Sequence, residues 1–340
     1  MKKVLVTGGK LLVVGNPADF HVGAHFRRAA ESLGWPVVFS DVRVAYGTGR
    51  LVRSLFFHCF GRRPVRLGAF SRLVRQVARE EGCTHLLATG LAPLRAAELA
   101  DIRSARVRLF NFLTDDPWNP AHHAHWFMAG LKLYDCVFSP RRQNLAELRS
   151  FGCRRVDYLP FAYCPEVHFR HPQSPGAAEG ETDVLFAGGA DADRVPELRA
   201  LHHAGLRLAL YGAYWERDAV LRPFAKGIAD LGTLRQVTPA AKLVLCLVRR
   251  ANRDGHAMRS FEAPAMGGCL LMEDTSEHRE LFGADGECAV YFRDLPEMVA
   301  KAKDLLPRVE ERARLAAAAH RRICAGGHTY ADRLRTMLAE

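Results

Sequence analysis

Short apolar runs alternate with amphipathic segments from the start of the chain. Residues 10–15 (Lys-Leu-Leu-Val-Val-Gly) form one such run, a helical pattern follows at 23–33, and residues 36–40 (Pro-Val-Val-Phe-Ser) form the next run. A short, almost wholly apolar run is typical of a strand that is buried on both faces of a parallel sheet. This part of the sequence therefore predicts a β-α-β unit.

The alternation continues along most of the sequence. In the first half, we expect strands at 85–88, 107–112, 136–138 and 156–159 and helices at 70–81, 94–99 and 142–150. In the second half, we expect strands at 183–187, 206–211, 243–248, 269–272 and 289–292 and helices at 194–204, 259–266 and from 295 onward. Strands that alternate with helices predict α/β domains whose parallel sheets are covered by helices on both faces.

A polar stretch rich in Pro, Gly and Ala interrupts this pattern at 166–182. The chain of 340 residues is long enough for two domains. We therefore predict two Rossmann-like domains that face each other across a cleft. The expected boundaries are an N-terminal domain at 1–165, a linker at 166–182, a C-terminal domain at 183–325, and a C-terminal helix at 326–340 that could return to the N-terminal domain.

The composition limits the class of protein. Hydrophobic residues make up 49% and charged residues 25% of the chain, which is ordinary for a globular protein and argues against a disordered one. No apolar run is long enough to span a membrane, and Met1–Gly9 lacks the long apolar region and cleavage site of a signal peptide. The nine cysteines are too scattered for zinc-ribbon spacing. We therefore expect reduced thiols and a cytoplasmic protein.

The positive charge is distributed unevenly along the chain. The net charge is +11, with 24 basic and 12 acidic residues in 1–165 but 24 basic and 25 acidic residues in 166–340. The whole excess therefore lies in the first half. Such an asymmetry indicates that this half faces an anionic partner, such as an acidic substrate, a membrane surface or a nucleic acid.

The basic residues are densest in residues 50–75, which contain seven arginines, no acidic residue and several interleaved phenylalanines. One interpretation is a basic, aromatic helix that makes peripheral contact with anionic lipid at the inner face of the membrane. The alternative is a pair of amphipathic helices whose phenylalanines enter the core while the arginines are solvated. The pattern alone leaves both interpretations open.

Two adjacent acidic residues follow one of the expected strands. Asp115 and Asp116 stand just after the strand at 107–112, and ligands bind at the carboxyl ends of strands in parallel sheets. Either carboxylate could orient or deprotonate an acceptor hydroxyl, which makes both of them candidate catalytic residues. The alternative role is that of a cap for the segment that follows.

A second candidate site follows the strand at 183–187, where Gly188 and Gly189 precede a helix. Backbone N–H groups at such a position suit a phosphate. The nearby Asp191-Ala-Asp193 resembles a metal-binding D-x-D string but is equally typical of a capped helix start. The spacing of Gly8 and Gly15 does not fit a dinucleotide-binding fingerprint. We therefore expect no dinucleotide cofactor, and a phosphate at the Gly188-Gly189 loop would not require a metal.

The most informative stretch is 252–275. A loop with Arg253 and Asp254 leads into a helix with Arg259 and Glu262, which is followed by two glycines and a buried strand. This stretch resembles the C-terminal domain of GT-B glycosyltransferases of the glycosyl transferases group 1 type. It is most similar to the CgeB-like (spore-maturation) subgroup, through the pattern Arg-x-Phe-Glu-Ala. The resemblance continues at 280–294 and, in the first half, at 114–117 and 134–139.

The resemblance implies roles for these residues. GT-B enzymes bind a nucleotide-sugar mainly in the second domain and the acceptor in the first. Glu262 matches the glutamate that holds the ribose hydroxyls, which suits a carboxylate because it accepts two hydrogen bonds. Asp254 stands where a catalytic glutamate faces the donor sugar, but it is one methylene shorter. Arg253 and Arg259 could neutralise the diphosphate, and the alternative for Arg259 is a surface salt bridge.

The sequence as a whole thus favours a cytoplasmic, metal-independent glycosyltransferase. It would transfer a sugar from a nucleoside diphosphate sugar, without any cofactor, to an anionic or membrane-associated acceptor or glycan. The alternatives are a GT-B enzyme that transfers nothing, such as a nucleotide-sugar epimerase, and a basic nucleic-acid-binding protein. No recognition motif supports the latter, so a nucleic-acid partner is not expected. The resemblance leaves the retaining and inverting mechanisms both open.

Overall fold

The computed structural model describes residues 9–47, 49–170 and 181–339. Residues 1–8 of the predicted N-terminal domain and residues 171–180 of the predicted linker lie outside this range. The chain forms two compact units. The first unit comprises residues up to 160 together with 251–253 and the segment from 330 onward, and the second comprises 161–250 and 254–329. The chain passes between them at Pro160, slightly before the predicted end of the N-terminal domain.

The first unit is built on a six-stranded parallel sheet with the order β2-β1-β3-β4-β5-β6. Its strands are β1 (Leu11–Gly15), β2 (Val37–Asp41), β3 (His85–Thr89), β4 (Arg108–Phe112), β5 (Cys136–Ser139) and β6 (Val156–Tyr158). Its helices are α1 (Val22–Ser32), η1 (Val42–Tyr46), α2 (Arg50–Cys59), α3 (Leu67–Glu80), α4 (Ala96–Ser104), α5 (His125–Leu131), α6 (Gln143–Phe151) and α13 (Tyr330–Leu338).

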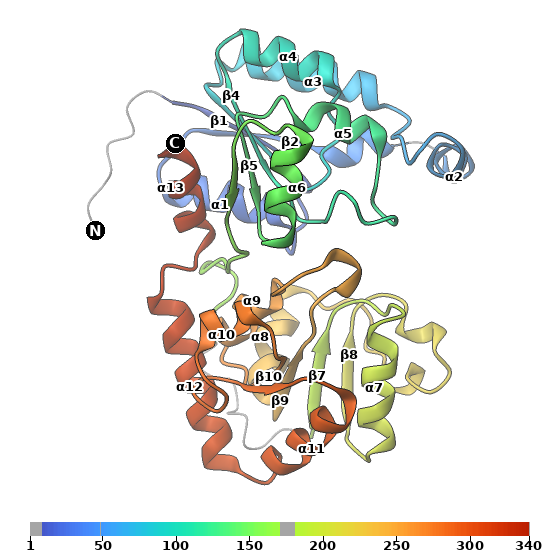
Figure 1. Ribbon diagram of the computed structural model, residues 1–340, viewed down its shortest axis with the longest axis vertical. Helices are drawn as coiled ribbons and strands as arrows, with labels where there is room; N and C mark the ends of the chain where they lie inside the picture. The colour runs from blue at the N-terminus through green and yellow to red at the C-terminus, as the bar shows by residue number, and fades with distance from the viewer. Residues whose placement is uncertain (1–8, 48, 171–180, 340) are drawn as a thin grey trace. The chain divides into compact units, whose positions relative to one another are not determined.

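Helices cover both faces of this sheet, with α3 and α4 on one face and α1 and α13 on the other (Figure 1). Every residue of β1 is buried, as expected for a strand between two helical layers. Leu12 and Val14 pack in one core with Phe70 of α3. On the other face, the ring of Phe26 lies 5.1 Å from that of Tyr330 in α13. The last helix thus completes the core of the first unit, although it comes from the end of the chain.

The second unit contains a five-stranded parallel sheet with the order β11-β10-β9-β7-β8. Its strands are β7 (Val184–Ala187), β8 (Leu208–Tyr211), β9 (Leu243–Cys246), β10 (Leu270–Glu273) and β11 (Val290–Phe292). Its helices are α7 (Arg194–His203), η2 (Trp215–Arg217), η3 (Arg222–Phe224), α8 (Leu231–Ala240), α9 (Arg259–Ala265), α10 (Ser276–Phe282), α11 (Leu295–Leu305) and α12 (Val309–Ala325). A further short helix, η4 (Arg250–Asn252), begins in the second unit and ends in the first.

Both sheets reverse their strand order at one place. In the first unit, β1 lies between β2 and β3, and in the second unit, β7 lies between β8 and β9. The connections leave these central strands in opposite directions, which opens a crevice at their carboxyl ends where ligands bind in this class of fold. The fold therefore predicts ligand-binding positions at the carboxyl ends of β1 and β3 in the first unit and of β7 and β9 in the second unit.

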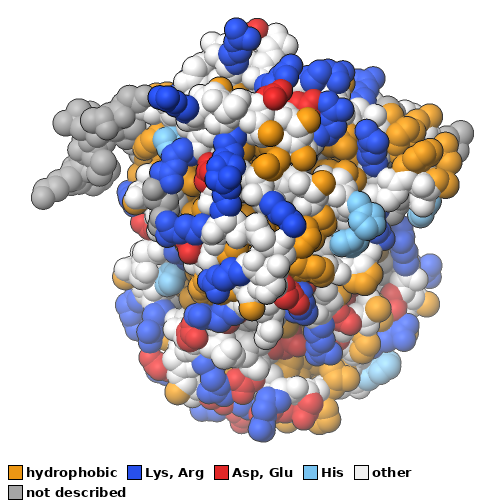
Figure 2. Space-filling view, turned by 45° about the horizontal axis from the view of Figure 1, so that its top comes forward, with side chains coloured by type: hydrophobic (Ala, Val, Ile, Leu, Met, Phe, Trp, Pro, Cys, Tyr) orange, Lys and Arg blue, Asp and Glu red, His pale blue; other side chains and the backbone are white. Residues whose placement is uncertain are grey.

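The basic segment 50–75 forms two different helices. Helix α3 buries Phe70 in the core and exposes Arg72 and Arg75, as the core interpretation expects. Helix α2 differs, because the side chain of Leu55 is 52% exposed and that of Val52 is 45% exposed. Figure 2 shows apolar side chains gathered at the right edge of this unit, where α2 lies, beside a surface with many Lys and Arg side chains. Within the described residues, no helix has the length and apolar character to cross a bilayer.

Candidate functional site

The loop after β7 brings the backbone of two chain segments close together. Gly188 donates a hydrogen bond to the carbonyl of Tyr211 at 2.7 Å and accepts one from the indole of Trp215 at 2.8 Å. A Cβ at Gly212 would lie 2.2 Å from the Gly188 carbonyl oxygen, and Gly212 has a φ of +142°. Only glycine tolerates this approach and this backbone conformation. The loop with Gly188 and Gly189 therefore has a defined shape at the carboxyl end of β7.

Arg194, the first residue of α7, folds back over this loop. Its Nη1 atom lies 3.0 Å from the Gly189 carbonyl oxygen and 3.4 Å from a carboxylate oxygen of Asp191, and its guanidinium covers the ring of Phe186. Its buried Nε has no hydrogen-bond partner within the described part of the chain. Burial lowers the pKa of Arg194, which still leaves it a cation. A buried cation with an unused donor beside a glycine loop suits an anionic ligand.

The helix α9 begins at the carboxyl end of β9, the strand next to β7. Glu262 is 4% exposed, and its carboxylate lies 3.0 Å from Nη1 of Arg259 and 3.7 Å from Nε2 of the buried His168. The backbone N–H of Cys164 donates to Nδ1 of His168, so Nε2 carries the proton and faces Glu262. The buried Nε of Arg259 has no partner among the described residues. The alternative of a surface salt bridge does not fit, because the pair is largely buried.

The segment that leads into α9 is fixed by buried hydrogen bonds. His256 accepts a bond from the backbone of Phe161 at Nε2, and its Nδ1 lies 2.5 Å from Glu277. A Cβ at Gly255 would lie 2.4 Å from the Glu277 carboxyl carbon, so only glycine lets the loop pack there. Asp254 precedes this anchor, is half-buried, and exerts an electrostatic influence on Arg194. Asp254 is therefore held in the neighbourhood of the Gly188-Gly189 loop.

The start of α9 has a second anchor, the Ser260–His278 pair. Nδ1 of His278 donates to the carbonyl of Glu273 at 2.8 Å, so Nε2 accepts the hydroxyl proton of Ser260 at 2.9 Å. Burial lowers the pKa of His278 to about 4, which keeps this histidine neutral at physiological pH. Neutral hydrogen bonds thus position Arg259 and Glu262 in the second unit.

In the first unit, the two predicted catalytic acids differ in environment. Asp116 is 1% exposed and accepts hydrogen bonds from the backbone of Trp118 at 3.0 Å and from Nε of Arg253 at 2.6 Å. The side chain of Asp115 is 25% exposed, accepts a bond from Asn252 at 3.1 Å and lies 3.6 Å from Nε2 of His122. Asp116 therefore has the geometry of a turn cap, whereas Asp115 remains accessible.

Arg253 belongs to the first unit, although its sequence neighbours belong to the second. Its Nη1 and Nη2 atoms each lie 2.7 Å from an oxygen of Glu147, in addition to the bond from Nε to Asp116. These carboxylates raise the pKa of Arg253, and Arg253 in turn lowers the pKa of Glu147. The structure thus brings Arg253 together with Asp116, and places Gly188, Gly189, Asp254, Arg259 and Glu262 in the other unit.

Three residues at these edges were not predicted from the sequence. Arg194 carries a signal that could have found it, namely a basic residue at the first position of the helix after two glycines. His21 precedes α1 at the carboxyl end of β1, where burial and Arg43 lower its pKa while Asp115 opposes the shift. Arg141 is 1% exposed and donates to the carbonyls of Leu113 and Thr114, just before Asp115. No local pattern marks Arg141, because its partners are distant in sequence.

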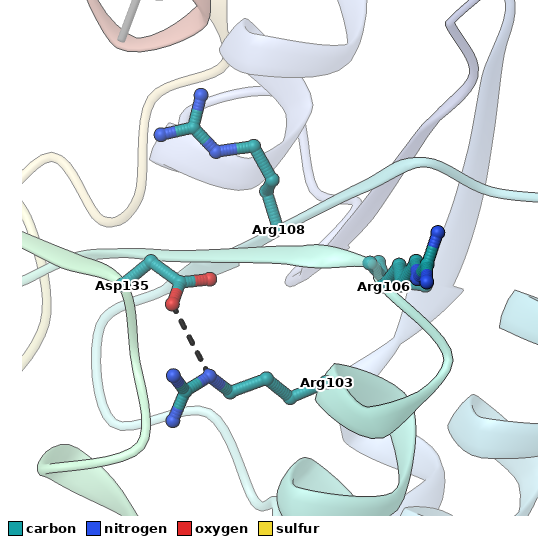
Figure 3. Close-up of a pocket in the computed structure, with 5 residues that line it drawn as sticks. Arg103, Arg106, Arg108 and Asp135 are labelled. Atoms are coloured by element: carbon teal, nitrogen blue, oxygen red, sulfur yellow. Dashed lines mark ion pairs between the residues drawn. The ribbon is translucent and has the colours of Figure 1, made fainter.

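A separate depression of about 290 Å³ lies in the first unit and is lined by Arg103, Arg106, Val107, Arg108 and Asp135. Figure 3 shows Asp135 and Arg103 pointing toward each other, while Arg108 points away from them. The Nε atom of Arg103 lies 3.3 Å from a carboxylate oxygen of Asp135. The depression lies at the amino ends of β4 and β5, because Arg108 begins β4 and Asp135 precedes β5. It is therefore separate from the carboxyl edge of the sheet, where the candidate catalytic residues lie.

The second unit matches a known family model. Residues 194–339 match a family model described as "Glycosyl transferase-like", and no curated protein matches the chain. The match spans most of the second unit, including Arg194, Arg259 and Glu262. It confirms the predicted glycosyltransferase type of enzyme at the level of this domain, but not the CgeB-like subgroup.

Solved structures share the fold along nearly the whole chain. Sucrose-phosphate synthase from Thermosynechococcus elongatus has a TM-score of 0.70 at 12% identity, over 98% of both chains. Anabaena HepE in complex with UDP and glucose has a TM-score of 0.64 at 14% identity, over 98% of this chain and all of the other. A Listeria monocytogenes protein assigned as a UDP-N-acetylglucosamine 2-epimerase has a TM-score of 0.56 at 15% identity, over 97% and 95%. The predicted α/β fold with two Rossmann-like domains of the GT-B class is confirmed.

Proposed function

We propose that this protein is a glycosyltransferase that takes a sugar from a uridine diphosphate sugar, which it binds in the second unit. The observation that carries the proposal is the pair of partly buried arginines, Arg194 and Arg259, at the carboxyl ends of β7 and β9, each with a buried Nε that has no partner among the described residues. Two guanidinium groups beside a glycine loop suit a diphosphate, since each presents several donors to phosphate oxygens. Uridine is favoured because HepE, with the same fold, binds UDP.

Within this site, we assign the diphosphate to Arg194 and Arg259 together with the backbone of Gly188 and Gly189. Glu262 would accept hydrogen bonds from the ribose hydroxyls, with Arg259 and His168 orienting its carboxylate. Asp254 would face the donor sugar. Arg253 has no place in this donor site, because Asp116 and Glu147 already pair its charge. The residues assigned here supply positive charge from the chain itself, and the proposal involves neither a metal nor a cofactor.

We propose that the first unit binds the acceptor and that Asp115 acts as the general base. Asp115 is the more accessible of the two acids. Arg141 holds the backbone carbonyls of Leu113 and Thr114 just before it, and Asn252 donates to its carboxylate. A general base must reach the proton that it removes and must be ionised when the acceptor arrives. His21 is a second candidate, because its lowered pKa leaves the imidazole neutral at pH 7. Asp116 would then act as a structural partner of Arg253.

The acceptor proposed here is anionic, or is carried by an anionic membrane surface that the protein contacts from the cytoplasm. The first unit carries the whole basic excess, and α2, which belongs to the basic segment 50–75, exposes Val52 and Leu55. Exposed apolar side chains in a basic segment are typical of helices that lie on anionic lipid. Because α2 comes from the first unit, this contact would bring the acceptor-binding unit to the lipid.

The second candidate function is a nucleotide-sugar epimerase, which is favoured by the fold shared with the Listeria monocytogenes protein. Both functions require the same donor site, so binding of a nucleotide-sugar does not separate them. They differ in the product, because a transferase releases the nucleoside diphosphate only as it forms a new glycosidic bond. We favour transfer because the family model that matches the second unit is glycosyl transferase-like.

Calorimetric titration of UDP tests the donor site directly. We expect the Glu262→Gln variant to bind UDP more weakly by about 1–3 kcal/mol, because a charged acceptor for the ribose is replaced by a neutral one. Glu310→Gln, at an exposed position of α12, is the matched control and should bind as the unmodified protein does. Equal affinity in the Glu262 variant would remove this residue from the site. Absence of UDP binding to the unmodified protein would overturn the proposal.

A further inference from the structure

Cys324 differs from the buried cysteines of this chain. It lies in the last turn of α12, and its side chain is exposed, whereas seven of the nine cysteines are buried. Burial raises the pKa of Cys153 to about 11 and that of both Cys246 and Cys269 to about 12. Such thiols stay protonated and unreactive in water. Cys59 is the other exposed cysteine and offers a natural reference for Cys324.

One turn before Cys324, His320 presents its ring to the thiol. The Cys324 Sγ atom lies 3.7 Å from Nδ1 and 3.9 Å from Nε2 of His320. Nδ1 also lies 3.0 Å from the carbonyl oxygen of Pro264, which can only accept, so Nδ1 carries the ring proton of the neutral imidazole. Nε2 is then the basic nitrogen that can take the proton of the thiol. The hydroxyl of Tyr163 also hydrogen-bonds the sulfur.

The charges around this pair act in both directions. Burial alone raises the pKa of Cys324, but the hydrogen bonds and charge of His320, with Tyr163, outweigh it and leave the pKa below that of an ordinary thiol. The thiol in turn raises the pKa of His320, against the opposing charge of Arg170. The carboxyl end of α12 disfavours a thiolate but favours an imidazolium, so its two effects offset each other. These contacts therefore favour transfer of the thiol proton from Cys324 to His320.

We propose that Cys324 and His320 form a nucleophilic thiolate–imidazolium pair. Cys324 would then be the modification site of this chain that reacts first with small electrophiles and peroxides. In the reaction with a peroxide, the Cys324 sulfur bonds to one oxygen as the O–O bond breaks. The departing oxygen takes a proton from His320. The thiol is oxidised to a sulfenic acid, and the peroxide is reduced to water or an alcohol.

The test is the pH dependence of alkylation by iodoacetamide, followed for each cysteine by peptide mass spectrometry. An ordinary thiol is only about 1% ionised at pH 6.5. We expect Cys324 to react at least about tenfold faster than Cys59 at that pH, with the difference narrowing to less than about threefold at pH 9.5. A low-pKa thiolate is intrinsically a somewhat weaker nucleophile, which limits the expected ratio.

Two variants test whether the reactivity of Cys324 comes from its pairing with His320 or only from its exposure to solvent. His320→Gln removes the imidazolium but keeps a side chain that can donate to Pro264, and it should lower the rate at Cys324 to that of Cys59. Tyr163→Phe should lower the alkylation rate at Cys324 less than His320→Gln does. Equal rates of Cys324 and Cys59 at pH 6.5 in the unmodified protein, or an unchanged rate in His320→Gln, would overturn the proposal. UDP binding is not part of this inference, so the two proposals succeed or fail separately.

Discussion

The charged side chains at the carboxyl edges of the two sheets differ in how completely their hydrogen-bonding groups are paired. In the first unit, Arg253 is paired with both Asp116 and Glu147, so the charges satisfy one another. In the second unit, Arg194 and Arg259 each keep a buried Nε without a partner in the described part of the chain. Buried donors are normally satisfied, and those that are not mark places where a ligand completes the set. The comparison teaches that an arginine near a strand end is a candidate for ligand binding only when some of its hydrogen-bond donors have no partner in the protein.

The largest expected effect separates the two acids of the first unit. Asp115→Asn should lower turnover by a factor of ~10²–10⁴, the range for loss of a general base, with UDP affinity unchanged. Asp116→Asn should instead lower the free energy of unfolding, because it leaves Arg253 with one carboxylate fewer. Transfer assays and urea denaturation of both variants measure this contrast. If both variants keep full activity, the acidic pair is structural and the base lies elsewhere, with His21 as the first residue to test.

The next effect concerns the unused donors of the second unit. Arg194→Gln should weaken UDP binding by about 1.5–3 kcal/mol, because charge-assisted hydrogen bonds to phosphate are lost. Arg199→Gln is the matched control on the same helix, since Arg199 pairs with Asp218 on the surface. The two variants are compared by calorimetry under identical salt. Similar affinities would mean that the unused donors of Arg194 do not point to a ligand.

A smaller effect concerns the titratable groups that stabilise each unit, His278 in the second and Glu147 in the first. His278 has a pKa of about 4 in the folded chain and about 6.5 when unfolded, so the unfolded chain binds more protons between these values. Stability should therefore fall as the pH drops from 6.5 toward 4, by up to about 1.4 kcal/mol per pH unit. The Glu147 carboxylate has a lowered pKa, so its contribution is fully present above about pH 4.3 and is lost only below.

Urea denaturation between pH 7 and pH 4.5 measures this dependence. The variant His278→Asn should flatten the slope, while His203→Gln, at an exposed position of α7, should leave it unchanged. An unaltered slope in His278→Asn would show that other groups carry the acid sensitivity of the chain.

The last expected effect, which is the smallest for each residue replaced, concerns the basic surface of the first unit. Replacing Arg62, Arg63 and Arg66 with Gln should weaken binding to anionic liposomes by roughly 1 kcal/mol per residue, and more clearly at low salt. Replacing Arg199, Arg217 and Arg222 of the second unit removes the same charge and should have less effect. Co-sedimentation measures both. If the unmodified protein does not sediment with such liposomes even at low salt, the acceptor is a soluble anion.

Much of the fold was predictable from local patterns. Strands such as β1 and β9 are continuous apolar runs, and in a parallel sheet such a run has no other stable place than between two helical layers. The loop after β7 was also predictable, because two glycines between a strand and a helix are typical of a tight loop at the end of the strand. The sequence alone therefore determined the α/β class, the order of the strands and the loop in the second unit, whereas the helices α5, α8 and α10 were not predicted.

Other features depend on residues that are distant in sequence. Arg253 was expected beside the donor with Arg259, but the tertiary structure gives its three donors to Asp116 and Glu147, which come from another part of the chain. The distinction between Asp115 and Asp116 arises in the same way, since only burial and partner choice separate two identical side chains. Pairing is decided by which elements pack together, and a linear pattern of charges carries no information about that.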